Sequence, residues 1–260
     1  IESVGTPLKD WDIQINYGIK TGFNDAFIIN TEKRNEILDN CCSDEERTKT
    51  AELIRPILRG RDIKRYGYNW ADLWLIATFP SRHYDIEMYP AVKAHLLSFG
   101  KERLEQTGKK YIINGEEIKA RKKTSNKWFE TQDSISYWDD FLLPKLIYPE
   151  TTQGAFFAYD ETGLFLDKTC FMMISKHARY LQATLSSQLF EFAYKRIFSS
   201  VELGQHGFQY NKHALIKLHV KKFNESDSVA YSDEFFYNCY GITNEEIEYI
   251  VGAIQSLQNQ

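Results

Sequence analysis

The chain lacks the features of membrane-bound, metal-binding and disulfide-linked proteins. No apolar run approaches the roughly 18 residues that a membrane span requires, and the first residues lack the basic start and apolar stretch of a signal peptide. The four cysteines form no Cys-x-x-Cys pair, which argues against a zinc site and a disulfide framework. We therefore expect a cytoplasmic protein with reduced cysteines and no membrane partner.

Catalytic motifs are also absent. The six prolines include no adjacent pair, so there is no Asn/Asp-Pro-Pro-aromatic motif of the kind with which adenine methyltransferases hold a flipped base. The chain has no Gly-x-Gly-x-x-Gly after a predicted strand, no His-x-x-x-His pair and no Gly-x-Ser-x-Gly elbow. Lys20 and Thr21 precede Gly22, whereas a P-loop places Gly-Lys-Ser/Thr at its second glycine. The sequence thus assigns no catalytic residue, metal or cofactor to these 260 residues.

A metal-dependent DNA nuclease is one alternative. The Asp/Glu-x-Lys triplets at 62–64 and 117–119, with an upstream acid such as Asp85, have the composition of such a site. With 26% charged residues, however, such triplets arise readily by chance, and a metal site needs ligands that converge. Metal-dependent DNA cleavage by the isolated chain would favour this alternative.

Charge is unevenly distributed. Residues 224–260 hold seven acids and no Lys or Arg, so with a net charge of −4 for the whole chain, residues 1–223 carry +3. From Arg55 to Lys127 there are sixteen Lys or Arg against eight Asp or Glu. A polyanion responds to the local field, which makes the middle third a candidate contact surface. We expect a recognition domain at 1–223 and an acidic helical extension at 224–260 packed on it; a protein-interaction module that docks a partner through this extension is the second alternative.

The most basic stretch lies at 53–67. Its apolar residues can anchor in a core while its cations face outward, and arginine's planar fork matches phosphate oxygens. Only Asp62 opposes these cations. A solvated charged face is the plainer interpretation of such a run. The cations are Arg55, Arg59, Arg61, Lys64 and Arg65.

Local patterns predict both helices and strands. Capping boxes at Ser43 with Glu46 and at Thr243 with Glu246 each begin a helix, and Thr31 is a candidate cap for a third. The apolar spacing predicts helices over 89–106 and 180–198. Apolar runs predict strands at 72–78, 145–148, 155–159 and 170–174.

Asn114-Gly115 between two short runs predicts a β-hairpin. The returning arm ends in Lys119, Arg121, Lys122 and Lys123. A two-stranded ribbon edged with cations can enter a major groove. An ordinary surface hairpin, whose lysines discourage edge pairing, is the alternative.

The order of several stretches resembles one family. These are Gly-Ile-Lys-Thr-Gly-Phe-Asn-Asp-Ala-Phe-Ile-Ile at 18–29, the basic strip at 54–66, Tyr-Trp at 137–138 with Pro-Lys-Leu-Ile-Tyr-Pro at 144–149, Leu-Ser-Ser-Gln-Leu-Phe-Glu-Phe at 185–192, and the ending at 237–247. Together they are similar to the TaqI-like C-terminal specificity domain. That family forms the target recognition domain of type IIG-like restriction-modification enzymes and related adenine-N6 DNA methyltransferases.

The resemblance implies a mixed α+β specificity domain, with a twisted sheet, flanking helices and a helical end. It also implies that double-stranded DNA is the partner and that an upstream domain of the same polypeptide binds S-adenosylmethionine and methylates adenine. That the chain begins with Ile suggests a piece of such a polypeptide. We expect phosphate contacts from Arg59, Arg61, Lys64 and Arg65. Base or backbone contacts are expected from Lys20, Thr21, the arm from Lys119 to Lys123, and Gln205, His206 and Gln209 in the loop 204–209.

Overall fold

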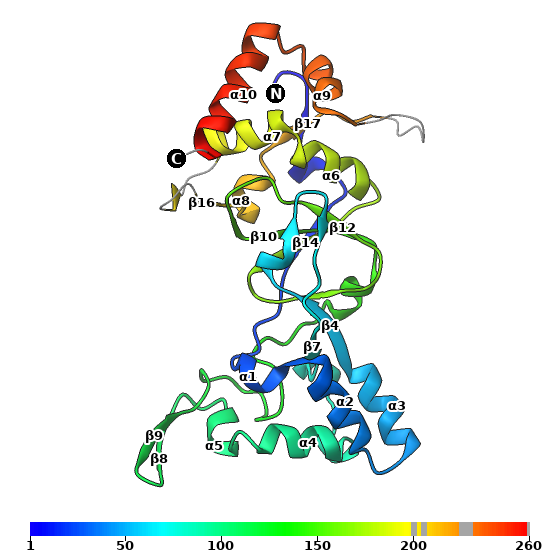
Figure 1. Cartoon of the computed structure of the whole chain (residues 1–260), viewed down its shortest axis with the longest axis vertical. Coiled ribbons are helices and arrows are strands. Elements are labelled where there is room, and N and C mark those ends of the chain that lie inside the picture. Colours follow the sequence, from blue (N-terminus) through cyan, green and yellow to red (C-terminus); the bar gives the residue numbers. More distant parts are fainter. Residues whose placement is uncertain (199–201, 204–206, 224–230, 259–260) are drawn as a thin grey trace. The chain divides into compact units, whose positions relative to one another are not determined.

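The computed structural model describes residues 1–198, 202–203, 207–223 and 231–258, which belong to two compact units (Figure 1). Unit 1 comprises Ile1–Gly18, Arg59–Asn69 and Asp140–Gln260, and unit 2 comprises Ile19–Leu58 and Trp70–Asp139. The mixture of helices and strands confirms the predicted α+β class. The basic strip is divided between the units after Leu58. The described helices of the acidic extension belong to unit 1, and the expected boundary at residue 223 stays a prediction.

Unit 1 contains an antiparallel sheet in the order β12-β10-β14-β2. Its strands are β2 (Gln14–Tyr17), β10 (Lys145–Pro149), β12 (Ala158–Asp160) and β14 (Cys170–Ile174). The apolar runs at 145–148 and 170–174 thus form the two central strands as predicted. The strand predicted at 155–159 is shorter, because pairing with β10 begins only at Ala158.

The remaining elements of unit 1 are short strands and helices. The strands are β1 (Thr6–Pro7), β5 (Ile63–Lys64), β6 (Gly67–Tyr68), β11 (Thr151–Thr152), β13 (Phe165–Leu166), β15 (Glu202–Leu203), β16 (Gly207–Gln209) and β17 (His219–Val220). The helices are η1 (Leu8–Asp10), η2 (Gly60–Asp62), α6 (Ala178–Ser186), α7 (Gln188–Ala193), the π-helical turn η6 (Tyr194–Phe198), α8 (Lys212–Leu215), α9 (Asp233–Tyr240) and α10 (Asn244–Gln258). A further short helix, η5 (Trp138–Leu142), spans the boundary of the two units.

Aromatic side chains fill the core of unit 1. Tyr148 on β10 stacks on Phe171 of β14, with ring centroids 5.4 Å apart. The helix predicted over 180–198 is interrupted at Ser187, whose extended backbone ends α6 and whose side chain accepts the Phe190 N–H of α7. Serine favours this capping position because its hydroxyl satisfies an otherwise unpaired helix N–H. α10 then packs beside α7 (Figure 1).

Two buried tyrosines of this core differ in hydrogen bonding. The Tyr148 hydroxyl has no hydrogen-bond partner among the described residues, whereas the Tyr194 hydroxyl donates to the Gln209 carbonyl at 2.6 Å. An unsatisfied buried hydroxyl costs free energy. We therefore expect Tyr148→Phe to leave the free energy of unfolding unchanged or raise it by about 1 kcal/mol, and Tyr194→Phe to lower it by about 1 kcal/mol. Urea titrations test this, and equal losses for both variants would show that the Tyr148 hydroxyl is satisfied.

Unit 2 combines a small antiparallel sheet with short helices. β3 (Ile28–Asn30) and β4 (Ile54–Leu58) both pair with β7 (Leu73–Ile76), whose Leu75 and Ile76 are fully buried. The ribbon of β8 (Lys110–Ile113) and β9 (Glu116–Lys119) is separate from this sheet. The helices are α1 (Asn24–Phe27), α2 (Thr31–Asp39), α3 (Asp44–Leu53), η3 (Pro80–Arg82), η4 (Ile86–Met88), α4 (Pro90–Leu97) and α5 (Lys101–Leu104).

Capping decides where these helices begin and end. Ser43 caps α3 as predicted, but the Glu46 carboxylate accepts the N–H groups of Cys42 and Ala91. The cap of α2 is Asn30, not Thr31. The helix predicted over 89–106 is divided at Gly100, whose φ of 86° lies in the left-handed region that favours glycine.

In unit 1, Thr243 and Glu246 form the predicted capping box at the start of α10.

Candidate nucleic-acid interface

The β8–β9 ribbon of unit 2 is built as its sequence predicts. Asn114 and Gly115 have φ values of 52° and 84°, so both central residues of the turn are left-handed, which matches the right-handed twist of the strands. Lys110 lies opposite Lys119, and Ile112 lies opposite Glu117. The ribbon extends beside α5 (Figure 1).

The two faces of the ribbon differ in burial. Tyr111, Ile113 and Ile118 are half-buried, and the Tyr111 hydroxyl donates to Glu105 just after α5. This face holds the ribbon on unit 2. The opposite face is exposed throughout, and we call it the open face; it consists of Lys110, Ile112, Glu117 and Lys119.

Exposed lysines gather at the foot of the ribbon. Lys122 and Lys123 follow β9, and Lys109 precedes β8. These three side chains and those of Lys110 and Lys119 are open to solvent. The sequence interpretation missed Lys109 and Lys110. The register imposed by a turn at 114–115 places Lys110 opposite Lys119 and could have revealed it.

Arg121 lies inside unit 2 and not on its surface. Only 4% of it is exposed, and its guanidinium donates to the backbone carbonyls of four residues. Burial lowers the pKa of Arg121 to about 10, so it remains protonated at neutral pH. The acceptors are Leu104 at 2.7 Å, Thr21 at 2.8 Å, Glu130 at 2.8 Å and Trp128 at 2.6 Å. This placement corrects the expectation that Arg121 contacts DNA, because its donors are already satisfied.

The glycine-punctuated loop provides one exposed cation. Lys20 is exposed, and its main chain bonds to Gln132 and Asp133. Thr21 is 1% exposed; its hydroxyl donates to Asn24 at 2.6 Å and accepts the Phe23 N–H. Thr21 therefore shapes the start of α1, which corrects its expected role as a DNA contact.

In unit 1, the basic strip continues through η2 and the β5–β6 pair. Arg59 forms an ion pair with the buried Asp62 at 2.8 Å, and the negative charge of Asp62 compensates the guanidinium. Arg61 and Lys64 are exposed, with Lys64 Nζ donating to the Arg61 carbonyl at 3.0 Å. Of the four cations expected on phosphates, Arg61 and Lys64 thus remain accessible. Tyr66, 60% exposed, lies close to them in sequence.

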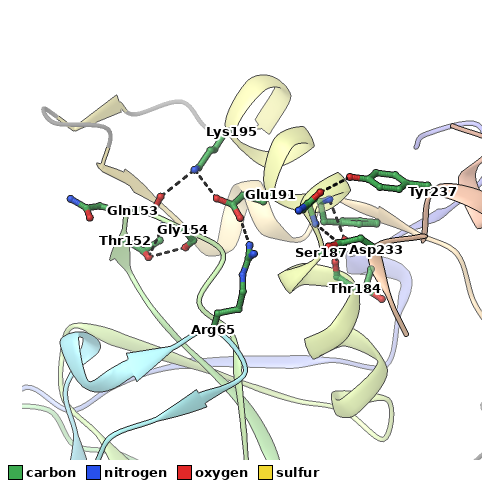
Figure 2. A network of polar contacts seen from close by, with 12 residues as sticks. Arg65, Thr152, Gln153, Gly154, Thr184, Ser187, Glu191, Lys195, Asp233 and Tyr237 are labelled. Atoms are coloured by element: carbon green, nitrogen blue, oxygen red, sulfur yellow. Dashed lines mark hydrogen bonds and ion pairs between the residues drawn. The ribbon is translucent and has the colours of Figure 1, made fainter. Parts of the chain in front are cut away.

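Arg65 belongs to an internal network of unit 1 (Figure 2). Its guanidinium forms an ion pair with Glu191 on α7, a residue that is fully buried. Lys195 approaches the same carboxylate at 2.8 Å and donates to the Gln153 carbonyl at 3.1 Å. The ion pair gives Arg65 a structural role in unit 1, and its expected phosphate contact stays a prediction.

The other predicted residues are distributed over both units. Arg55 is half-buried on β4 of unit 2, where it interacts within the protein. Gln209 is half-buried on β16 of unit 1, opposite Thr151. Gln205 and His206 lie outside the described residues.

The acids of the nuclease alternative each have a local role. Asp62 pairs with Arg59, Glu117 pairs with Lys110 at 2.8 Å, and Asp85 caps η4. Among the described ranges, no three His, Cys, Asp or Glu side chains are grouped to hold a metal ion. Within the same ranges, no helix has the length and apolarity to cross a membrane.

Comparisons with known proteins identify one family and two similar structures. The model of the TaqI-like C-terminal specificity domain matches residues 55–218. The type IIL restriction-modification enzyme MmeI, solved in complex with DNA, matches 100% of this chain with a TM-score of 0.54 and 13% identity. The type IIG restriction endonuclease BpuSI matches 100% of it with a TM-score of 0.55 and 14% identity. The chain covers 38% of the first enzyme and 31% of the second, and at these identities the likeness concerns the fold.

Proposed function

Because this chain belongs to the TaqI-like C-terminal specificity domain family, we propose that it is the DNA-recognition module of a restriction-modification enzyme. The family match confirms the resemblance found in the sequence, and the two similar folds come from restriction-modification enzymes. The module selects the sequence of double-stranded DNA on which other parts of the enzyme act. It holds the duplex by contacts to phosphates and selects the site by contacts to bases.

The proposal extends to the longer polypeptide of which this chain is expected to be a part, which we call the parent. Its upstream domain binds S-adenosylmethionine and methylates adenine at N6. The support is the ordered series of motifs shared with adenine-N6 methyltransferases. Sequencing that detects N6-methyladenine, in cells with and without the full-length parent, tests this part. Methylation at another base, or none, would contradict it.

The observation that carries the proposal is the group of exposed lysines at the foot of the ribbon. Lys119, Lys122 and Lys123 lie within five residues and are all exposed. Their ammonium groups have no partner carboxylate among the described residues. Uncompensated cations on a projecting ribbon attract phosphates and release counterions when they bind.

We expect Lys119→Gln/Lys122→Gln/Lys123→Gln to weaken DNA binding on the order of tenfold to a hundredfold at moderate salt. The slope of log K against log salt should become shallower by about 2 to 3, one unit for each lost phosphate contact. Fluorescence anisotropy with a duplex over a range of salt concentrations measures both quantities.

A matched control removes the same charge from the same unit. Lys33, Lys49 and Lys93 form ion pairs with Glu36, Glu45 and Glu87, so their charges are already compensated. Changing these three lysines to glutamine should leave the salt slope nearly unchanged. An unchanged slope for the ribbon variant would contradict the proposed surface, and no salt-sensitive binding by the unaltered chain would contradict the proposed function.

A further inference from the structure

The open face of the ribbon carries an apolar side chain that the fold does not use. Ile112 is 81% exposed, more than any other large hydrophobic side chain that the structure describes. A single exposed isoleucine is ordinary on a protein surface. What distinguishes Ile112 is its position among the charges of the open face.

The charges of the open face are arranged unfavourably for a free ribbon. Lys110 and Lys119 lie directly opposite each other, and like charges in this arrangement destabilise a strand pair. Lys110 is also paired diagonally with Glu117, at 2.8 Å, but both side chains are about 60% exposed, and such surface pairs contribute little. A polyanion along this face would relieve the repulsion between the two lysines.

The spacing of the open face fits a DNA major groove. Ile112 lies two residues beyond Lys110 along β8, which is about 7 Å at the rise of an antiparallel strand. The major groove is roughly 8.5 Å deep and admits a two-stranded ribbon. Ile112 and Lys110 point to the same side of the ribbon, because residues two apart in a strand share a face. With the open face turned toward the floor of the groove, Ile112 therefore meets the base edges, and the longer lysine side chains beside it extend to the phosphates at the rim. The apolar group displayed there is the 5-methyl group of thymine.

We propose that Ile112 reads the 5-methyl group of a thymine in the major groove, while Lys110 and Lys119 contact the phosphates at the rim. This inference deepens the proposed function and rests on it. Glu117 lies opposite Ile112 and shares Lys110 with the phosphate, and Glu116 points to the other face of the ribbon with Tyr111. The ribbon thus combines phosphate contacts, which do not depend on the DNA sequence, with a contact of Ile112 that depends on the methyl group of one thymine.

The test removes either the 5-methyl group of the thymine or the apolar side chain of Ile112. The 260-residue chain first selects its preferred duplex from a randomised library. Each thymine of that duplex is then replaced in turn by uracil, which lacks only the 5-methyl group. We expect one replacement to weaken binding by the unaltered chain about fourfold, the effect of burying roughly one methylene-sized group. Ile112→Ala should weaken binding to the thymine duplex by a similar factor and make the variant insensitive to that replacement.

Two further variants control for indirect effects. Met88→Ala removes another exposed apolar side chain of unit 2, 51% exposed, and should bind both duplexes as the unaltered chain does. Ile112→Gln keeps the length of the side chain but replaces its apolar end by an amide group. It should also lose the preference for thymine over uracil, which keeps the test valid if Ile112→Ala disturbs the ribbon.

Several results would overturn the inference. These are a selected motif without thymine, no single uracil replacement that weakens binding, or an Ile112→Ala variant that still distinguishes thymine from uracil. So would an Ile112→Ala variant that binds DNA normally but loses affinity for the catalytic part of the parent, since the open face would then be a protein contact. If the unaltered chain selects no motif at all, the proposed function fails first, so the two failures are distinguishable.

Discussion

Lys145→Met is expected to lower the free energy of unfolding by about 3–5 kcal/mol, because it leaves a buried carboxylate without its counter-charge. Lys145 and Asp160 are both 0% exposed, with Nζ and Oδ2 2.5 Å apart. Nζ also donates to the Phe141 carbonyl at 2.5 Å. Burial by itself would raise the pKa of Asp160, but the charge and hydrogen bond of Lys145 hold that pKa below its ordinary value.

Urea unfolding followed by circular dichroism measures this loss. Hydrogen exchange should place it in β10, β12 and β14, because Lys145 begins β10 and Asp160 ends β12. The double variant Lys145→Met/Asp160→Leu removes both charges and should recover most of the stability, since apolar replacements of a buried ion pair are often neutral. A single Lys145→Met variant as stable as the unaltered chain would contradict the expectation.

Arg121→Met is expected to lower the free energy of unfolding by about 3–5 kcal/mol, because four backbone carbonyls, three of them in buried hydrogen bonds, lose their donor at once. Tryptophan fluorescence during urea unfolding is a suitable measurement, since Trp70, Trp74, Trp128 and Trp138 lie in unit 2 and only Trp11 lies in unit 1. Arg121→Lys retains the charge but not the planar guanidinium group that reaches four acceptors. It should lower the free energy of unfolding by nearly as much.

The neighbouring Lys122 provides the control for Arg121. Lys122 is exposed, so Lys122→Met should change the free energy of unfolding by no more than about 0.5 kcal/mol. The two variants differ by one position in the chain and remove the same charge. If Arg121→Met proved as stable as Lys122→Met and weakened DNA binding instead, the original expectation for Arg121 would be restored.

The features that the sequence predicted well depend on a few consecutive residues. Asn114-Gly115 specifies its turn through backbone conformation alone, and Thr243 finds Glu246 within one helical turn. The central strands of unit 1 follow from continuous apolar runs. The family was recognisable for a different reason, namely the order of several short motifs along the chain.

The features that the sequence predicted poorly depend on partners that are distant in the chain. Arg65 resembles a surface cation until Glu191, 126 residues later, is found beside it. Arg121 stands next to two exposed lysines, and one of its acceptors, the carbonyl of Thr21, lies 100 residues earlier. A local pattern of charge cannot separate cations that compensate an interior group from cations that await a ligand. Only the fold makes that distinction.

The alternation of the chain between the two units has a practical consequence for protein engineering. Residues 59–69 belong to unit 1 but are flanked on both sides by segments of unit 2. No single cut can therefore excise either unit intact, and a truncation from either terminus removes part of unit 1 while leaving its segment 59–69 in place. Grafting unit 2 from a homologue requires exchanging 19–58 and 70–139 together while retaining the host's 59–69 between them. Exchanging residues of the ribbon alone avoids these junctions, and if the ribbon reads bases as proposed it is the simpler route to altered specificity.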